Sequence, residues 1–280
     1  MTSLTSRIAG SSLGKKLLSS PLAGIAAFPW RLGAVAKANA KRAGAGARWL
    51  FGSRENTNYT YNLTERNLEH LAWFVSTLVD IPVSEARGYM QELLDDDALK
   101  KHVADAIQAS PQRWLADSTA RFGRRVGWYA IVRARKPKNV VETGTDKGLG
   151  ALVLAAAVMR NGTGRLTTID INPDSGYLIS GVWAEVTNRV IGDGVETITN
   201  TLSDVDFFIH DSDHSSEYEK REFVAIGPKL TKDALVLSDN AHASDSLLQW
   251  AEETGRHYLY FGEEPLNHWY PGASIGVAFR

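Results

Sequence analysis

Residues 139–162, NVVETGTDKGLGALVLAAAVMRNG, are typical of a short buried strand, a glycine-rich turn and an apolar helix. The β-branched residues favour a strand over 139–144, and Asn161-Gly162 ends the helix. Helical stretches separate most of the short apolar runs that follow in the chain. These runs lie at 165–171, 189–194, 204–211 and 234–240. Strands that alternate with helices indicate a parallel sheet with helices on both faces.

Two more strands are expected at the end of the chain, at 257–262 and 273–280. The connection between them is too short for a helical crossover, so they should pair antiparallel. We therefore predict an α/β, Rossmann-like, seven-stranded sheet over residues 113–280, with five parallel strands and a C-terminal antiparallel hairpin. A helix at 116–134 is expected to precede the first strand.

The sequence before this domain divides into two parts. Residues 56–112 carry apolar residues at helical spacing and no strand pattern, so we expect a small helical unit that packs on the sheet domain or covers it as a lid. Residues 1–55 form a basic arm. Its first 54 residues contain nine Lys or Arg and no Asp or Glu, whereas the rest of the chain carries a net charge of -10. The chain has no cysteine, which excludes disulfides, thiolate metal sites and thiol catalysis.

The charge of the arm favours contact with an anionic membrane surface, and a flexible tail is the alternative. Its apolar runs are shorter than the ~18–20 residues of a membrane span. A secretory signal or an organelle transit peptide is a weaker alternative, because Ser19, Ser20 and Pro21 interrupt the apolar stretch. Trp30 and Trp49 are too few for a nucleic-acid stacking platform. We expect a cytoplasmic homo-oligomer that lies at the inner membrane face and binds no nucleic acid.

The turn VETGTDKGLG follows the first strand, where open α/β sheets bind ligands. Its glycine spacing matches neither the dinucleotide fingerprint nor the P-loop. The pattern E-x-G-x-x-x-G, formed by Glu142, Gly144 and Gly148, instead resembles the first motif of class I S-adenosylmethionine-dependent methyltransferases. The resemblance implies S-adenosylmethionine as cofactor, with Glu142, Gly144, Thr145 and Gly148 at its site.

Two further acidic positions extend this cofactor site. Asp170 ends the second strand, where a carboxylate can accept hydrogen bonds from both ribose hydroxyls. A turn or helix cap before Asn172-Pro173 is the alternative. The resemblance places Asp193 and Gly194 beside the adenine, although Gly-Asp-Gly is also an ordinary turn.

The stretches FFIHDSDH (207–214) and LVLSDN (235–240) end the fourth and fifth strands, which are neighbours. Asp211, Asp239 and Asn240 could therefore converge, and their oxygens suit Mg²⁺ or Mn²⁺. The paired motifs resemble those of metal-dependent catechol, caffeoyl-CoA and sugar O-methyltransferases over residues 120–280. The resemblance implies that these three residues bind the metal. Turn and cap residues at strand ends are the alternative.

A bound cation would lower the pKa of an acceptor hydroxyl, and a nearby base would take its proton. The resembled catechol enzymes carry a lysine three residues after the first metal aspartate, and this chain has His214 there. His214 can act as the base, with Asp213 and His242 as competitors. Asp211 is expected to serve catalysis, cofactor and metal. His210 precedes it on the strand, points to the opposite face and is expected to be structural.

The loop EEPLNHWYPG (263–272) joins the last two strands. It could supply a substrate pocket, or it could be hydrophobic cover over a sheet edge. The expected substrate residues are His242, Asn267, His268, Trp269 and Tyr270. We favour a hydroxyl acceptor on a sugar of a glycolipid, polysaccharide or natural product. A nicotinamide-dependent oxidoreductase and a silent adenosyl-binding partner of a glycosyltransferase complex are the alternatives. The missing dinucleotide fingerprint and the paired aspartate motifs count against the oxidoreductase. The presence of both metal motifs counts against the silent partner.

Overall fold

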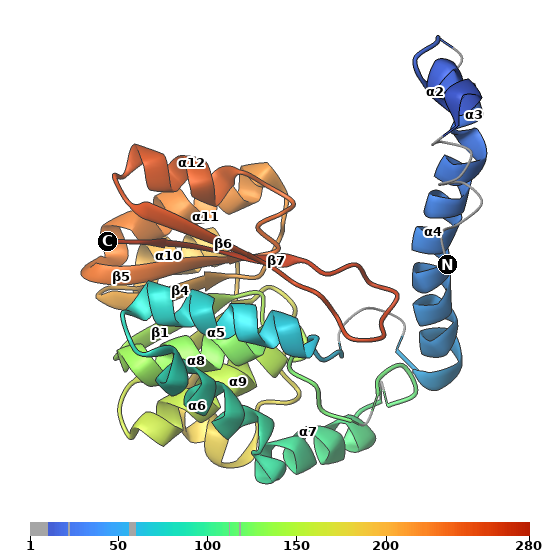
Figure 1. Ribbon diagram of the computed structural model, residues 1–280. Coiled ribbons are helices and arrows are strands. Elements are labelled where there is room, and N and C mark those ends of the chain that lie inside the picture. Colours follow the sequence, from blue (N-terminus) through green and yellow to red (C-terminus); the bar gives the residue numbers. More distant parts are fainter. Residues whose placement is uncertain (1–10, 22, 56–59, 112, 118) are drawn as a thin grey trace. The chain divides into compact units, whose positions relative to one another are not determined.

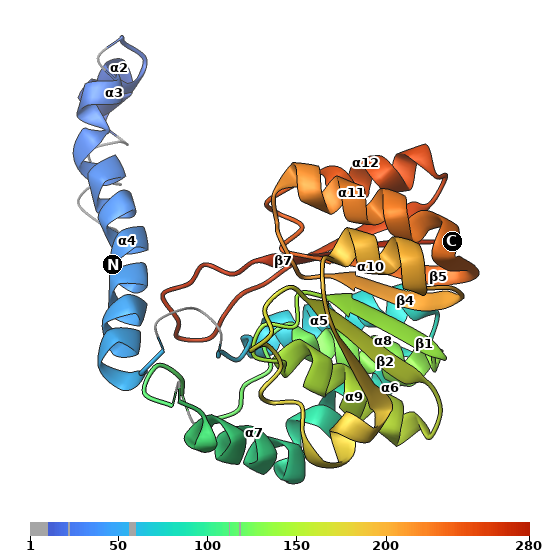
Figure 2. The same cartoon turned by 180° about the vertical axis from the view of Figure 1, so that it is seen from behind.

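The computed structural model describes residues 11–21, 23–55, 60–111, 113–117 and 119–280 (Figures 1 and 2). The described chain forms two compact units. The larger unit contains Ser53–Leu266 and Tyr270–Arg280 and holds the whole sheet. The smaller unit contains the described residues up to Gly52 together with Asn267–Trp269.

A seven-stranded sheet with the order β3-β2-β1-β4-β5-β7-β6 lies at the centre of the larger unit. Strands β1 to β5 run parallel, and β7 pairs antiparallel with both β5 and β6. The predicted sheet of five parallel strands and a C-terminal antiparallel hairpin is therefore confirmed. The strands are β1 (Asn139–Thr143), β2 (Arg165–Asp170), β3 (Thr187–Ile191), β4 (Val205–His210), β5 (Leu230–Asp239), β6 (His257–Gly262) and β7 (Ser274–Phe279).

Helices cover both faces of this sheet (Figures 1 and 2). Helices α5 to α9 contribute to the core on one face, and α10 to α12 contribute to the core on the other. Strand β4 contributes to both, because Phe207 and Ile209 point into the first core and Phe208 points into the second. The helices of this unit are α5 (Glu65–Val79), α6 (Val83–Leu94), α7 (Asp97–Ala109), α8 (Arg125–Arg135), α9 (Leu149–Asn161), α10 (Gly194–Thr201), α11 (Ser216–Ile226) and α12 (Ser246–Glu253), with short 3₁₀ turns at Gly181–Val186 and Gly227–Lys229.

Helix α5 packs directly against the end of strand β6 and the start of the loop that follows it. The ring centroids of Phe74 and Phe261 are 5.8 Å apart. The Asn67 side chain donates to the carbonyl of Gly262 and accepts from the backbone N–H of Glu264. Helices α5 to α7 thus belong to the same compact unit as the sheet. The domain boundaries drawn from the sequence at 55 and 112 stay predictions.

Two helices differ from the sequence-based expectation. Helix α8 begins at Arg125 and not at 116, because Gly123 turns the chain with φ +50° against the Tyr61 ring. Helix α10 was not predicted, although parallel β3 and β4 need a crossover between them. Its threonine-rich sequence has low intrinsic helix propensity, and Asp193 caps its first turn.

The smaller unit is helical over most of its described length. Its helices are α2 (Ser12–Leu18), α3 (Ala23–Ala26) and α4 (Phe28–Gly52). Among the residues that the structure describes, no helix is long and apolar enough to cross a membrane.

Candidate functional site

A pocket of about 460 Å³ opens at the carboxyl ends of the parallel strands, where β1 separates β2 from β4. This is the topological switch point of the sheet, where α/β proteins bind ligands. The pocket walls come from the loops after β1, β2, β3 and β4. Lining residues predicted from the sequence are Gly144, Asp170, Asp193, Gly194, Asp211 and Asp213.

Gly144 makes the close approach of two strands at this pocket possible. Its φ is +88°, and a Cβ atom there would lie 2.0 Å from the carbonyl oxygen of Asp211. Only glycine fits both the backbone conformation and the space. Gly148 also has a positive φ, but it begins α9 and packs against Ile179 without lining the pocket.

Asp170 lines the pocket and orders two loops around it. Its Oδ2 accepts from the backbone N–H of Asp146 at 2.8 Å, and its Oδ1 accepts from that of Asn172 at 2.8 Å. A carboxylate has about four lone-pair sites, so two remain for hydroxyl donors of a ligand. The turn-forming and ribose-binding interpretations of Asp170 are therefore compatible.

Asp193 contacts Tyr218, a pocket residue that sequence reasoning missed. Its Oδ1 accepts from the backbone N–H of Glu196, and its Oδ2 accepts from the Tyr218 hydroxyl at 2.9 Å. Burial and this hydrogen bond raise the pKa of Tyr218 to about 12. Tyr218 lines the pocket from the first turn of α11. An aromatic residue two positions after the DSDHSS stretch was the available signal.

Glu142 lies behind the pocket wall and does not line it. It is buried and accepts from the Thr168 hydroxyl at 2.7 Å, and Thr168 in turn lies 2.6 Å from the Thr145 hydroxyl. Burial raises the pKa of Glu142 to about 8. Gly150 leaves the room for this carboxyl, because a Cβ there would lie 2.3 Å from Glu142 Oε1. Glu142 and Thr145 thus brace the glycine turn from beneath, where direct cofactor contacts were expected.

A second buried network supports the opposite wall. Glu222 of α11 accepts from the Thr143 hydroxyl at 2.6 Å and from the Ser212 hydroxyl at 2.9 Å, and its Oε2 lies 2.7 Å from His210 Nδ1. His210 is fully buried. The structural role predicted for His210 therefore agrees with its contacts. Glu222 has no sequence motif, and only the packing of α11 on β4 reveals it.

The polar ends of β4 and β5 meet beside the pocket, as predicted. Ligand atoms of Asp211, His214 and Asp239 lie within 4.8 Å of one another. His214 Nε2 is 3.7 Å from Asp211 Oδ1 and 2.8 Å from Asn240 Nδ2. Burial lowers the pKa of His214, so the imidazole is neutral at neutral pH. Burial and the neighbouring Asp239 raise the pKa of Asp211 well above its ordinary value.

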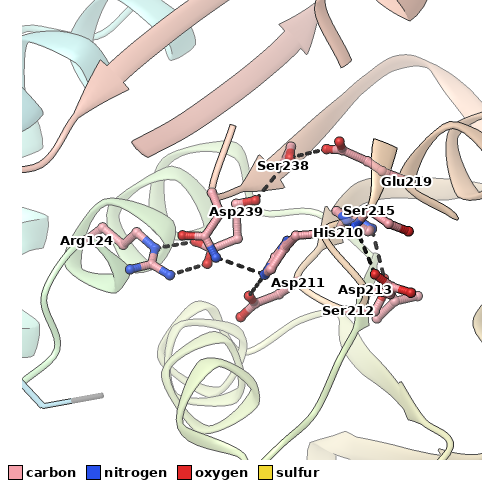
Figure 3. Close-up of polar contacts among 12 residues, drawn as sticks. Arg124, His210, Asp211, Ser212, Asp213, Ser215, Glu219, Ser238 and Asp239 are labelled. Atoms are coloured by element: carbon pink, nitrogen blue, oxygen red, sulfur yellow. Dashed lines mark hydrogen bonds and ion pairs between the residues drawn. The ribbon is translucent and has the colours of Figure 1, made fainter. Parts of the chain in front are cut away.

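Arg124 occupies this cluster from the segment before α8, and sequence reasoning missed it (Figure 3). Its Nε and Nη2 donate to Oδ1 and Oδ2 of Asp239. Its Nη1 donates to Glu263 Oε1 at 3.0 Å and to the Tyr61 hydroxyl. Burial alone would raise the pKa of Asp239, but the guanidinium holds it below its usual value. Ser238, one residue earlier on β5, points to the other face and donates to Glu219.

The remaining expected catalytic and substrate residues lie in different surroundings. Asp213 accepts from the backbone N–H of Ser215, which lowers its pKa, and it faces the pocket (Figure 3). His242 Nδ1 is 3.2 Å from the Ser274 hydroxyl. The ring of Tyr270 lies 5.8 Å from that of Tyr61.

Three expected substrate residues belong to the other compact unit. Asn267, His268 and Trp269 group with the helical arm, where the rings of His268 and Trp269 lie 5.7 and 5.6 Å from Trp49. Their role toward a substrate stays a prediction.

Residues 141–241 match the family model described as a methyltransferase domain. These residues form a methyltransferase domain. The match begins in β1 and ends just after Asn240, so it includes the pocket and the polar cluster. The predicted class of fold is confirmed. No curated protein matches this chain.

The comparison with solved structures found matches to this chain. Cofactor-bound Rv0187 from MTB is 18% identical, with 67% of this chain and 91% of that chain covered and a TM-score of 0.50. The O-methyltransferase TomG from Streptomyces achromogenes is 18% identical, with coverages of 66% and 90% and a TM-score of 0.48. An O-methyltransferase from Bacillus cereus is 13% identical, with coverages of 69% and 96% and a TM-score of 0.49.

Proposed function

We propose that this chain is an S-adenosylmethionine-dependent O-methyltransferase that acts on a hydroxyl group. The observation that carries the proposal is the position of one neutral imidazole, His214, in the polar cluster that borders the pocket of the methyltransferase domain. The pocket volume of about 460 Å³ lies in the range of small-molecule sites.

The pocket residues suit the parts of the cofactor. Asp170 would accept from the ribose hydroxyls, while Asp193 and Tyr218 would border the adenine. Gly144 lets the turn after β1 pack against the Asp211 backbone, which shapes the pocket wall between them. When bound, S-adenosylmethionine supplies a methyl group on a sulfonium, which is a good leaving group.

His214 is the proposed general base. The acceptor oxygen forms a bond to the methyl carbon, the carbon–sulfur bond breaks, and the hydroxyl proton passes to the imidazole. The Asn240 amide nitrogen lies 2.8 Å from Nε2 and orients the ring, and the acceptor hydroxyl displaces this contact when its proton passes to Nε2. Asp213 is a poorer base, because its lowered pKa reflects a hydrogen bond with Ser215.

The metal part of the sequence prediction does not fit the side chains as they are placed. Both oxygens of Asp239 accept from Arg124, and the Asn240 amide nitrogen contacts His214. Asp211 lies 4.0 Å from Arg125 Nη2 and 3.7 Å from His214 Nε2, so it too already has charged and polar partners. No step of the proposed reaction therefore passes through a metal ion.

The acceptor class is also a proposal. A sugar hydroxyl is supported by polar groups next to an aromatic side chain, which is the usual composition of carbohydrate sites. Here His214, Asn240 and His242 supply polar groups from the β4 and β5 ends and the loop after β5. The nearest aromatic residue that the contacts connect to this cluster is Tyr61, whose hydroxyl accepts from Arg124 and whose ring lies 5.8 Å from that of Tyr270.

Calorimetry with S-adenosylmethionine tests the proposal, followed by transfer of a labelled methyl group to panels of sugars and catechols. Binding with a sugar-dependent transfer supports it. Absence of cofactor binding would refute it, and binding of NADH in its place would favour an oxidoreductase. Cofactor binding without transfer to any hydroxyl would favour a silent adenosyl-binding partner.

A further inference from the structure

We propose that Arg124 supplies the fixed positive charge of this active site, at the position that the resemblance assigns to a divalent metal ion, so that methyl transfer needs no metal. This inference rests on the proposed function. It concerns one residue that lies outside every motif of the sequence.

The hydrogen bonds of Arg124 use all three of its guanidinium nitrogens. Two of them form a parallel pair with Asp239 (Figure 3). The third donates to Glu263 and to the Tyr61 hydroxyl, and Tyr61 donates to Glu263 Oε2 at 2.6 Å. Bidentate pairing with a carboxylate matches the planar, forked geometry of a guanidinium.

Because this pairing is buried, it disfavours binding of a metal ion to the same carboxylates. The side chains of Asp239 and Glu263 are fully buried, and that of Arg124 is 7% exposed. Buried carboxylates need a cation close by, and Arg124 already provides it to both. A divalent ion bound to Asp239 would face the guanidinium across one carboxylate, where the two like charges repel each other strongly at low dielectric.

The arrangement gives Arg124 a positioning role. It holds Asp239 ionised and oriented, and the ligand atoms of Asp239 and His214 lie within 4.8 Å of each other. When His214 takes the acceptor proton, the imidazolium forms beside this fixed negative charge. The Asp239 carboxylate thus stabilises the protonated base, whereas a metal ion would favour proton loss by lowering the pKa of the hydroxyl.

Three measurements on the full chain test the inference. The first is electron paramagnetic resonance of added Mn²⁺, which reports binding without any need for activity. The second is methyl transfer after EDTA treatment, with and without Mg²⁺ or Mn²⁺ added back. The third compares Arg124→Ala and Arg124→Lys with Arg121→Ala, which removes a partly exposed arginine three residues earlier.

We expect the wild type to bind no stoichiometric Mn²⁺ and to keep its activity within about twofold in EDTA. Arg124→Ala should lose on the order of 100-fold in kcat with little change in cofactor affinity. It should gain Mn²⁺ binding, because the two hydrogen bonds from the guanidinium to Asp239 are removed. Arg124→Lys should recover part of kcat, and Arg121→Ala should behave as wild type.

Stoichiometric Mn²⁺ binding to the wild type, or loss of its activity in EDTA, would overturn the inference. If Arg124→Ala fails to fold, the wild-type measurements and Arg124→Lys still decide. Failure of the proposed function itself would be distinct, since it would appear as absent cofactor binding.

A separate observation concerns helix α4 of the smaller unit. From it we infer that α4 lies along an anionic membrane surface. Phe28, Leu32, Val35 and Leu50 are spaced so that, at about 100° per residue, they fall within ~60° of one another on the helix. Each is more than half exposed, so no described residue of the arm covers this stripe.

The basic charge of the arm indicates that this apolar stripe contacts an anionic membrane surface. Lys37 and Arg48 lie on the opposite side of α4 together with Trp30, and Arg31 and Arg42 flank the stripe. Residues 1–54 carry nine basic and no acidic residues. An apolar face with a basic opposite face suits a helix that rests in the headgroup region of an anionic bilayer. The charge opposes pairing with a second copy of the same arm.

Co-sedimentation of the full chain with lipid vesicles tests this inference. Leu32→Glu and Ala34→Glu add the same negative charge, one on the apolar stripe and one away from it. We expect binding to vesicles that contain phosphatidylglycerol and not to phosphatidylcholine alone. Ala34→Glu should weaken binding about fivefold and Leu32→Glu about 50-fold or more.

Equal effects of the two variants would show that no apolar face inserts, and would overturn the inference. Absence of vesicle binding would do the same, as would a wild-type dimer in solution that Leu32→Glu dissociates. Methyl transfer to a soluble acceptor should be unchanged in both variants, which separates this result from the proposed function.

Discussion

The buried carboxyl of Glu142 makes the stability of this protein depend on pH in an unusual direction. Its folded pKa is about 8, raised from 4.5 by burial. A carboxyl whose pKa rises on folding binds more protons in the folded state than in the unfolded state. The free energy of unfolding therefore falls as the pH rises through the interval from 4.5 to about 8.

The size of the effect follows from this interval. One pH unit corresponds to about 1.4 kcal/mol, so the whole interval corresponds to about 5 kcal/mol as an upper bound. The Thr168 hydroxyl still donates to the ionised carboxylate, and any water that enters reduces the loss further. We expect about half of the bound to be realised.

Urea denaturation of the wild type and of Glu142→Gln between pH 5 and 8 measures it. The amide has nearly the same shape and stays neutral, so the two proteins should have similar stability at pH 5. By pH 8 the wild type should be the less stable of the two by about 2–3 kcal/mol. Glu185→Gln, at an exposed position, is the matched control and should run parallel to the wild type. Parallel curves for the wild type and Glu142→Gln would refute the reasoning, because Glu142 would then ionise as an ordinary surface carboxyl does.

Four further substitutions test the pocket and the base. His214→Ala should lower kcat by about 100- to 1,000-fold, while the Kd for S-adenosylmethionine from calorimetry changes less than about twofold. Asp213→Asn should keep most of kcat. A large loss of kcat in Asp213→Asn and a small one in His214→Ala would move the base to Asp213. Asp170→Ala should raise that Kd by about 10- to 100-fold with kcat at saturation nearly unchanged, and an unaltered Kd would leave Asp170 as a turn former only. Gly144→Ala should lower the Tm by several degrees or prevent folding, because its Cβ would lie 2.0 Å from the Asp211 carbonyl oxygen; a stable variant with normal cofactor affinity would contradict the close approach.

Much of the fold was predictable from local patterns. Apolar runs such as DVDFFIH and ALVLSD identify strands buried on both faces, and the short loop at 263–272 requires an antiparallel pair. Helix α10 was not predictable in this way, because its residues have weak helix propensity and the crossover geometry alone demands a helix. The start of α8 depends on Gly123 meeting Tyr61, a contact between residues 62 positions apart.

The candidate site divides along the same line. Gly144, Asp170, Asp211 and Asp239 stand at strand ends, and strand ends gather at one edge whenever the sheet is parallel, so the sequence by itself determined where the site lies. Arg124 is different, because nothing in its local sequence distinguishes this buried arginine from the exposed ones.

Only the tertiary structure decided what kind of charge fills the site. Arg124 meets Asp239 and Glu263 because the segment before α8, the end of β5 and the start of the loop after β6 are packed together. Each charge alone would be costly to bury, and their mutual pairing compensates for that burial. A metal site can be inferred from the spacing of its ligands along the chain, whereas a guanidinium in its place is determined by packing across distances that spacing does not encode.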